Sequence, residues 1–241
     1  MKLFITDYDD TLYLNDNQIK ENIKKLKDLH KKNFLVVIST GRSYPSIKEK
    51  IRQYKIPYDY LTCADGSIIY DNKGNIVQEF IMNPQIINVF QMFYQNLNYE
   101  EIQFSYKEGY QNHLKSTNHL LGINICLSND NYSNELETNF LKMKDSYPEY
   151  NFLAYKHPNY SYLCVKPLNV SKSYAIAYLK DYLHIKMNDI YVIGDSSNDL
   201  EMIRDYHGVG MKNSCQEIIK IVGKTYNNVS EFIDDILKED N

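Results

Sequence analysis

The acidic residues near the amino terminus are the first side chains in this sequence with a spacing suited to chemistry. Residues 3–5 form a short apolar run, and Asp7 and Asp9 follow it directly in the segment 7-DYDDT-11. At the end of an extended strand, residues two positions apart point to the same face, so both side chains would lie together. An aspartate carboxylate can attack phosphorus, and hydrolysis of the aspartyl-phosphate then needs a second acid or base nearby. Asp9 is placed for that second role.

Two further apolar runs, residues 34–38 and 190–194, also end in polar residues that do not belong in a core. Ligands of an open parallel sheet bind outside the carboxyl ends of its strands. If the three strands are neighbours, their polar ends meet at one spot. The residues expected to converge are Asp7, Asp9, Thr11, Thr40, Asp195, Asn198 and Asp199.

This predicted cluster suits a divalent cation and a phosphate group. Asp7, Asp9 and Asp195 would repel one another strongly unless a cation lay between them. Hard oxygen ligands favour Mg²⁺, which also binds substrate phosphate. Phosphoryl transfer needs donors and positive charge around the phosphate oxygens as well. Thr40 and the Gly41 amide can supply the donors, and Lys172, in the first turn of a predicted helix, can supply the charge.

The elements that must position these residues alternate at both ends of the chain. Residues 1–80 predict strand, helix, strand, helix, strand and hairpin, with Asn17 as the N-cap of the first helix. From Ser171, which can cap a helix, the alternation returns with a strand at 190–194 and further helices. This order is typical of an α/β fold.

The middle third has a different order of predicted helices and strands. It predicts a helix from Pro84 to about Leu97, interrupted strands over 101–127, a helix over 132–145, and strands at 150–155 and 160–165 joined by residues 156–159. We therefore expect a Rossmann-like parallel sheet core made of residues 1–82 and 169–241. An α+β cap domain, residues 83–168, is inserted between them.

Composition excludes several classes of protein. The chain has 241 residues, 27 basic and 31 acidic side chains, a net charge of −4, and a hydrophobic fraction of 43%. That hydrophobic fraction excludes a disordered protein, and the charge excludes a generally basic nucleic-acid binder. The longest clean apolar run, residues 34–38, is far short of a membrane span. Four widely spaced cysteines indicate a reducing compartment. We expect a cytoplasmic protein with no nucleic-acid or membrane partner.

The constellation resembles the haloacid dehalogenase (HAD) superfamily of phosphatases. The segment 7-DYDDT-11 matches the family's DxDxT motif, Thr40 with Gly41 and Arg42 matches the TGR form of the second motif, Lys172 matches the third, and 194-GDSSND-199 matches GDxxND. These forms and the insert are similar to the Cof-type subfamily with a type IIB cap. The chain departs from the usual pattern at Asp65, where asparagine is common, and at Ser173, where glycine is common.

The resemblance implies roles for these residues. Asp7 would be the nucleophile and a Mg²⁺ ligand, Asp9 the acid/base and a ligand through its backbone carbonyl, and Asp195 the third protein ligand. Asn198 and Asp199 would support Lys172 or metal-bound water from outside the ligand set, and Thr11 would fix the loop of the first motif. Gly41 and Arg42 are candidates for substrate binding, although Arg42 fits a surface ion pair equally well. Asp65 fits either the mouth of the site or a turn beside Gly66.

The resulting hypothesis is a Mg²⁺-dependent phosphatase that hydrolyses a small phosphorylated metabolite, such as a sugar phosphate or a phosphorylated cofactor. A phosphomutase would share the nucleophile and the metal. A phospho-acceptor signalling module also uses clustered acids, although such modules are about half this length. We expect a small-molecule substrate as partner, and a monomer or a weak homo-oligomer.

Overall fold

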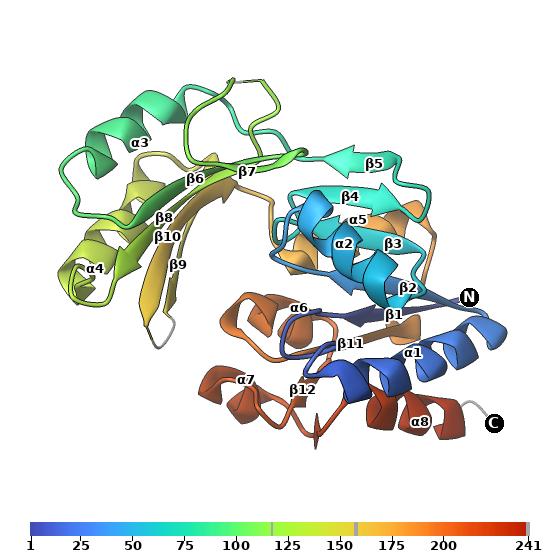
Figure 1. Ribbon diagram of the computed structural model, residues 1–241. Helices are drawn as coiled ribbons and strands as arrows, with labels where there is room; N and C mark the ends of the chain where they lie inside the picture. Colours follow the sequence, from blue (N-terminus) through green and yellow to red (C-terminus); the bar gives the residue numbers. More distant parts are fainter. Residues whose placement is uncertain (117, 157–158, 240–241) are drawn as a thin grey trace. The chain divides into compact units, whose positions relative to one another are not determined.

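The computed structural model describes residues 1–116, 118–156 and 159–239, which form two compact units (Figure 1). The first contains Met1–Arg42, Ser46–Gln78 and the chain from Ser171 onward. The second contains Ser43–Pro45 and Glu79–Val170. The two ends of the chain therefore build one unit, and the middle of the chain builds the other.

The first unit is organised around an eight-stranded sheet in the order β13-β12-β11-β1-β2-β3-β4-β5. β1 lies between β11 and β2 and is parallel to both, while β4 runs antiparallel to β3. The α/β fold class expected from the alternating elements is confirmed. The strands are β1 (Lys2–Thr6), β2 (Phe34–Ser39), β3 (Tyr60–Cys63), β4 (Ile68–Asp71), β5 (Ile76–Glu79), β11 (Ile190–Gly194), β12 (Val209–Met211) and β13 (Thr225–Tyr226).

The central strands form because their residues suit burial on both faces. Phe4 and Ile5 of β1 and Val37 of β2 are completely buried, as continuous apolar strands of parallel sheets usually are. Helices α1 and α8 contact each other, as do α5 and α6. The helices of this unit are α1 (Asp16–Lys31), α2 (Tyr44–Tyr54), α5 (Lys172–Tyr182), α6 (Leu200–Asp205), α7 (Gln216–Ile221) and α8 (Val229–Glu239), with the 3-10 turns η2 (Met187–Asp189) and η3 (Ser197–Asp199). All of α2 except its first two residues belongs to this unit.

The start of one helix differs from the prediction, and the start of another agrees with it. The N-cap of α1 is Asn15, whose side chain accepts hydrogen bonds from the amides of Asn17 and Gln18, so the expected cap at Asn17 is wrong. Both residues are good caps, and the extended backbone of Asn15 decides between them. Ser171 caps α5 as expected, because its side chain accepts from the amide of Tyr174.

The second unit has an antiparallel five-stranded sheet in the order β7-β6-β8-β10-β9. Its apolar core gathers around Phe90, Phe140 and Phe152, which form a chain of ring contacts. The predicted turn at 156–159 includes residues 157–158, which lie outside the described residues. The elements are α3 (Ile86–Tyr94), β6 (Glu101–Tyr106), β7 (Gly109–Gln111), β8 (Gly122–Ser128), α4 (Asn134–Lys142), η1 (Met143–Asp145), β9 (Tyr150–Lys156) and β10 (Tyr160–Pro167).

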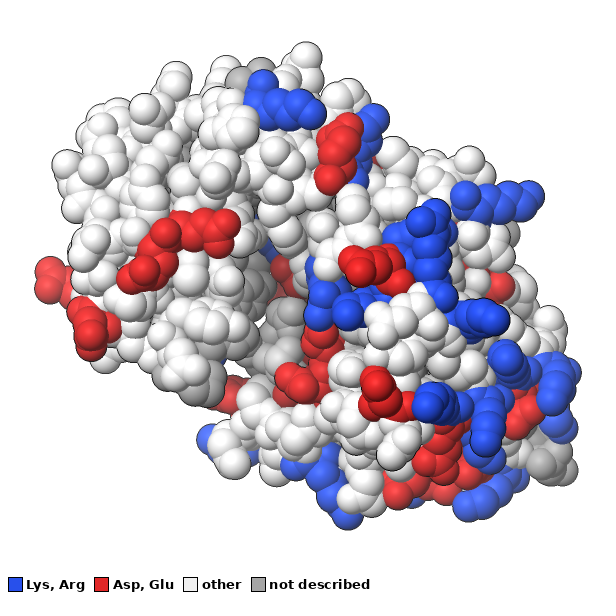
Figure 2. Space-filling view, in the orientation of Figure 1, with Lys and Arg blue, Asp and Glu red and all other residues white. Residues whose placement is uncertain are grey.

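The surface of the first unit carries side chains of both charges (Figure 2). On the face shown in Figure 2, basic and acidic side chains of the first unit are interspersed. No helix among the described residues has both the length and the apolar character that crossing a bilayer requires.

Gly66 allows the loop after β3 to lie against the start of α5. Its φ is +94°, and a Cβ added there would be 2.3 Å from the carbonyl oxygen of Ser171. Gly66→Ala should therefore lower the free energy of unfolding by more than about 2 kcal/mol, through backbone strain and this clash. Chemical denaturation measures the change. Gly223→Ala is the matched control, because nothing lies within 4 Å of its added Cβ. An equal effect at both glycines would contradict the prediction.

Candidate active site

The carboxyl ends of β11, β1 and β2 lie side by side, as the sequence argument required. Thr6, the last residue of β1, pairs with Ile193 of β11 on one side and with Ile38 of β2 on the other. The amide of Asp7 continues this pairing by donating to the carbonyl of Ile193 at 3.1 Å. The polar segments that follow the three strands therefore start at the same edge of the sheet.

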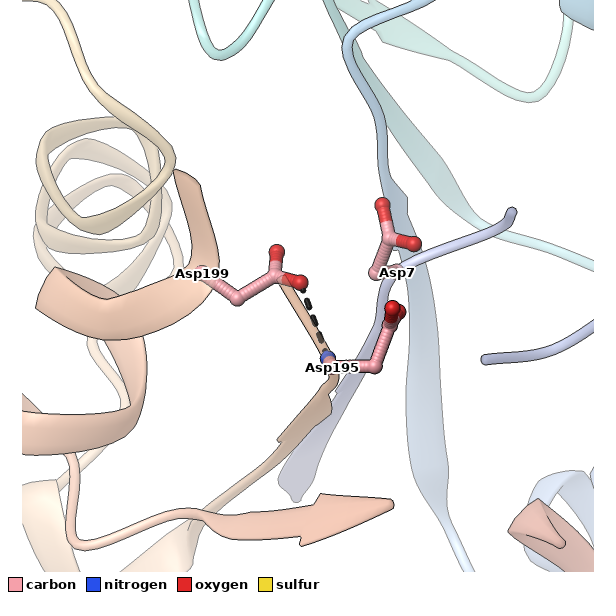
Figure 3. Close-up of side chains that lie close together, drawn as sticks. All are labelled: Asp7, Asp195 and Asp199. Atoms are coloured by element: carbon pink, nitrogen blue, oxygen red, sulfur yellow. Dashed lines mark hydrogen bonds between the residues drawn. The ribbon is translucent and has the colours of Figure 1, made fainter. Parts of the chain in front are cut away.

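Asp7, Asp195 and Asp199 form a buried acidic cluster at this edge (Figure 3). One carboxylate oxygen from each residue lies within 4.8 Å of the others. The side chains come from the segment after β1 and from the segment after β11, although these are far apart in the sequence. The cluster therefore depends on the pairing of the two strands.

Lys172 inserts its ammonium group into this cluster. Its Nζ donates to Oδ1 of Asp7 at 2.6 Å and to Oδ1 of Asp199 at 2.6 Å. The lysine side chain is only 1% exposed. It is held there because it opens α5, whose start is fixed by the Ser171 cap. The structure thus joins the lysine and the two acids that the sequence placed in separate motifs.

Asp199 also shapes the turn that carries Asp195. Its Oδ2 accepts hydrogen bonds from the amides of Asp195 at 3.0 Å and Ser196 at 3.1 Å, which forms a capping box with Ser196. The hydroxyl of Thr11 donates to Oδ1 of Asp195. Asp195 is therefore fixed through its backbone by Asp199 and through its side chain by Thr11.

The Asp9 side chain lies outside the buried cluster, which the two-residue spacing did not predict. β1 ends at Thr6, and the chain then turns, so the alternation of an extended strand no longer applies. The Asp9 carboxylate, 47% exposed, instead accepts two hydrogen bonds from Arg42, from Nε and Nη2 at 2.7 Å each. Of the two alternatives for Arg42, the structure shows an ion pair, and its partner is the residue expected to act as acid/base.

Thr40 and Gly41 lie in the loop after β2. Thr40 is buried, and its Oγ1 accepts from the amide of Arg42 at 3.1 Å, a contact that leaves the hydroxyl proton for another acceptor. Gly41 lies beside Asp65, since a Cβ at position 41 would be 2.8 Å from Oδ1 of Asp65. A side chain at position 41 would therefore collide with Asp65 unless Asp65 moved.

Two contacts involve the residues at which the sequence departs from the usual motif pattern. The Asn198 amide donates to Oδ1 of Asp65 at 2.9 Å, and the Ser173 hydroxyl donates to Oδ2 of Asp205 at 2.6 Å. Sequence reasoning did not pair these residues. The signal available was the replacement of the common asparagine and glycine by side chains able to form other hydrogen bonds.

Comparison with known proteins identifies the family. The model of the haloacid dehalogenase-like hydrolases matches residues 4–232. The chain belongs to this family. A curated relative, the 5-amino-6-(5-phospho-D-ribitylamino)uracil phosphatase YcsE of Bacillus subtilis, is 28% identical over 234 residues, which cover 91% of this chain and 87% of the relative. The predicted enzyme class, a HAD-like phosphatase, is thereby confirmed.

Solved structures of HAD-like phosphatases share the fold. Sucrose-phosphatase from Synechocystis superposes with a TM-score of 0.75 at 22% identity, and the match covers 99% of this chain and 98% of that one. The HAD subclass IIB sugar phosphatase BT4131 gives a TM-score of 0.77 at 14% identity, with 98% and 99% covered. This HAD-like chain therefore has the architecture that the Cof-type resemblance implied.

The electrostatics of the cluster fit a cation. Burial raises the pKa of Asp7 well above its ordinary value, against the opposing effect of Lys172. Burial also raises the pKa of Asp195 to about 7, although the Thr11 hydrogen bond opposes it. Burial alone would lower the pKa of Lys172, but Asp199 and Asp7 raise it above its usual range. One ammonium group thus faces three buried carboxylates, and oxygen ligands with excess negative charge suit Mg²⁺.

The raised pKa of Asp195 predicts a pH-dependent stability of the metal-free protein. The unfolded carboxyl has a pKa of about 3.9, so the folded state binds more protons between about pH 4 and 7. Its contribution to stability is present at low pH and is lost as the pH rises through 7. Asp195→Asn, which can still accept from Thr11, should therefore raise Tm at pH 8 in EDTA by about 2–4 °C.

Thermal denaturation at pH 5 and pH 8 tests this prediction, and the difference between variant and wild type should shrink at pH 5. Mg²⁺ should raise the Tm of the wild type more than that of Asp195→Asn. The control is Asp181→Asn, whose side chain is 77% exposed. An Asp195→Asn protein that is less stable than wild type at both pH values would show that the cluster is not destabilised by its own charge.

Proposed function

We propose that this phosphatase is Mg²⁺-dependent and hydrolyses a small phosphorylated metabolite, a sugar phosphate or a phosphorylated cofactor, through an aspartyl-phosphate on Asp7. The observation that supports this proposal most directly is the contact of Asp7 with Lys172 at 2.6 Å inside a buried acidic cluster. The positive charge of Lys172 reduces the electrostatic repulsion between the Asp7 carboxylate and an anionic phosphate group.

Each residue at the edge of the sheet then has a task. An oxygen of Asp7 attacks phosphorus, the bond to the leaving oxygen breaks, and water later releases phosphate and restores Asp7. The Thr40 hydroxyl, the Gly41 amide and the Lys172 ammonium group stabilise the phosphate oxygens. Thr11, Asn198 and Asp199 hold these groups in place.

Asp9 protonates the leaving oxygen and later takes a proton from water. Both oxygens of its carboxylate accept from Arg42 in the structure, so this role requires the pair to separate and Asp9 to take up a proton from solvent first. Arg42 is also a predicted substrate-binding residue, and a substrate anion can replace Asp9 as its partner. Substrate binding to Arg42 would therefore free the Asp9 carboxylate for its role as acid and base.

The side chains of Asp7 and Asp195 and the backbone carbonyl of Asp9 would hold Mg²⁺. The bound ion would supply positive charge at the phosphate oxygens, which lowers the repulsion between the anionic substrate and the acidic cluster. The second unit would act as the cap that selects the substrate. We also place the enzyme in the cytoplasm, a proposal supported by its free cysteines.

Asp7→Asn should lower the turnover of p-nitrophenyl phosphate by a factor of about 10³ or more, because the amide is a poor nucleophile towards phosphorus. Activity is measured in Mg²⁺ and again after EDTA treatment, which should abolish it reversibly. Asp10→Asn is the matched control, since this neighbouring acid is exposed. Full activity of Asp7→Asn, or no effect of EDTA, would overturn the mechanism.

A substrate panel should contain both a sugar phosphate and 5-amino-6-(5-phospho-D-ribitylamino)uracil, on which the relative from B. subtilis is named to act. We expect kcat/KM for one phosphorylated metabolite to exceed that for the aryl phosphate by at least about tenfold, because remote contacts lower the transition state. Reaction in ¹⁸O-labelled water should place the label in inorganic phosphate. A phosphorylated isomer of the substrate without free phosphate would instead indicate a phosphomutase.

A further inference from the structure

Asp65 connects two loops of the candidate site that are distant in the sequence. It follows β3 at the carboxyl edge of the sheet, and its Oδ1 accepts from the Asn198 amide at 2.9 Å. Asn198 belongs to the turn after β11, next to Asp199, which bonds to Lys172. A side chain outside the four motifs therefore contacts the motif that carries two of the buried acids.

The backbone around Asp65 is held in an unusual conformation. Ala64, Asp65 and Gly66 have φ values of +50°, +53° and +94°, all in the left-handed region. Two hydrogen bonds keep this loop in place, from the Ala64 amide to the Arg42 carbonyl at 2.9 Å and from the Asp65 amide to the Thr40 carbonyl at 3.0 Å. Left-handed residues other than glycine persist where the surroundings impose them, often at functional sites.

This anchoring directs the Asp65 side chain across the loop of the second motif. A Cβ at Gly41 would be only 2.8 Å from Oδ1 of Asp65, so the carboxylate occupies space that a side chain at 41 would fill. Asp65 thus lies between the loop after β2 and the turn after β11. Each of the two segments contains residues that the proposed mechanism requires.

The chemistry of a carboxylate also selects one orientation of the Asn198 amide. An ionised carboxylate only accepts hydrogen bonds, so Asn198 must present its NH₂ group to Asp65. Its carbonyl oxygen then faces the other way and accepts from the hydroxyl of Ser196. The opposite orientation would put two acceptors against each other.

We propose that Asp65 is a positioning residue, which fixes the orientation of Asn198 and thereby the 196–199 turn that presents Asp195 and Asp199 to the metal and the lysine. The inference rests on the proposed phosphatase mechanism but concerns a residue outside its motifs. Residues that orient metal ligands from behind typically change metal affinity or activity 10–100-fold when mutated.

Removal of the Asp65 side chain should weaken Mg²⁺ binding and lower kcat about tenfold or more. Asp65→Ala removes the acceptor, and Asp65→Gly removes it without the backbone penalty of a left-handed alanine. Asp65→Asn keeps an acceptor oxygen and tolerates the left-handed region, so it should stay within about threefold of wild type. Mg²⁺ affinity by titration calorimetry and kcat on p-nitrophenyl phosphate are the two readouts.

A double-mutant cycle tests the contact itself. Asn198→Ala removes the bond from the other side, so Asp65→Gly should add little to its effect. Asp71→Ala is the matched control. Asp71 also accepts hydrogen bonds from backbone amides in a turn, but it pairs with Tyr60, at the end of β3 opposite to Asp65. It should leave Mg²⁺ affinity and kcat unchanged.

Additive effects of Asp65→Gly and Asn198→Ala, or equal losses in Asp65→Asn and Asp65→Gly, would overturn the inference. So would wild-type Mg²⁺ affinity in a folded Asp65→Gly protein. Failure of the proposed function has a different outcome, since the wild type would then bind Mg²⁺ without turning over any phosphate ester. Calorimetry would still compare the Asp65 variants in that case.

Discussion

Lys172 is almost completely buried, and its ammonium group lies 2.6 Å from a carboxylate oxygen of Asp7 and 2.6 Å from one of Asp199. A buried charge is costly unless it is paired, and here the lysine is paired with two of the three buried carboxylates. The contact ties α5 to the ends of β1 and β11. The position of Asp7, the proposed nucleophile, therefore depends on a helix that begins more than half the chain later in the sequence.

The general location of the site could be predicted from the sequence because it depends on sheet topology. Asp7, Thr40 and Asp195 each follow an apolar run, so they meet if the three strands are neighbours. The sheet order β11-β1-β2 confirms that they are. The lysine could be placed near them because Ser171 is a good helix cap. These features follow from local patterns and from the rule that parallel strands share their carboxyl edge.

The details that the sequence did not predict depend on side-chain competition in three dimensions. We expected the Asp9 side chain beside Asp7, but the chain turns after Thr6. The guanidinium group of Arg42 instead donates two hydrogen bonds to the Asp9 carboxylate. Asn15 and Asn17 are equivalent as caps by type, and only the backbone distinguishes them. The bond between Asp65 and Asn198 joins residues 133 positions apart. No local pattern carries such information.

The pairing of β1 with β11 also affects how the chain folds during synthesis. Leu3 pairs with Ile190, so the centre of the larger sheet stays incomplete until most of the chain has left the ribosome. The second sheet uses only strands between Glu101 and Pro167, and all of its pairings are available earlier. Domains that are continuous in sequence can fold as they emerge. The acidic cluster needs residues from both ends of the sequence, so a nascent chain that stops before Asp195 has only one of its three acids.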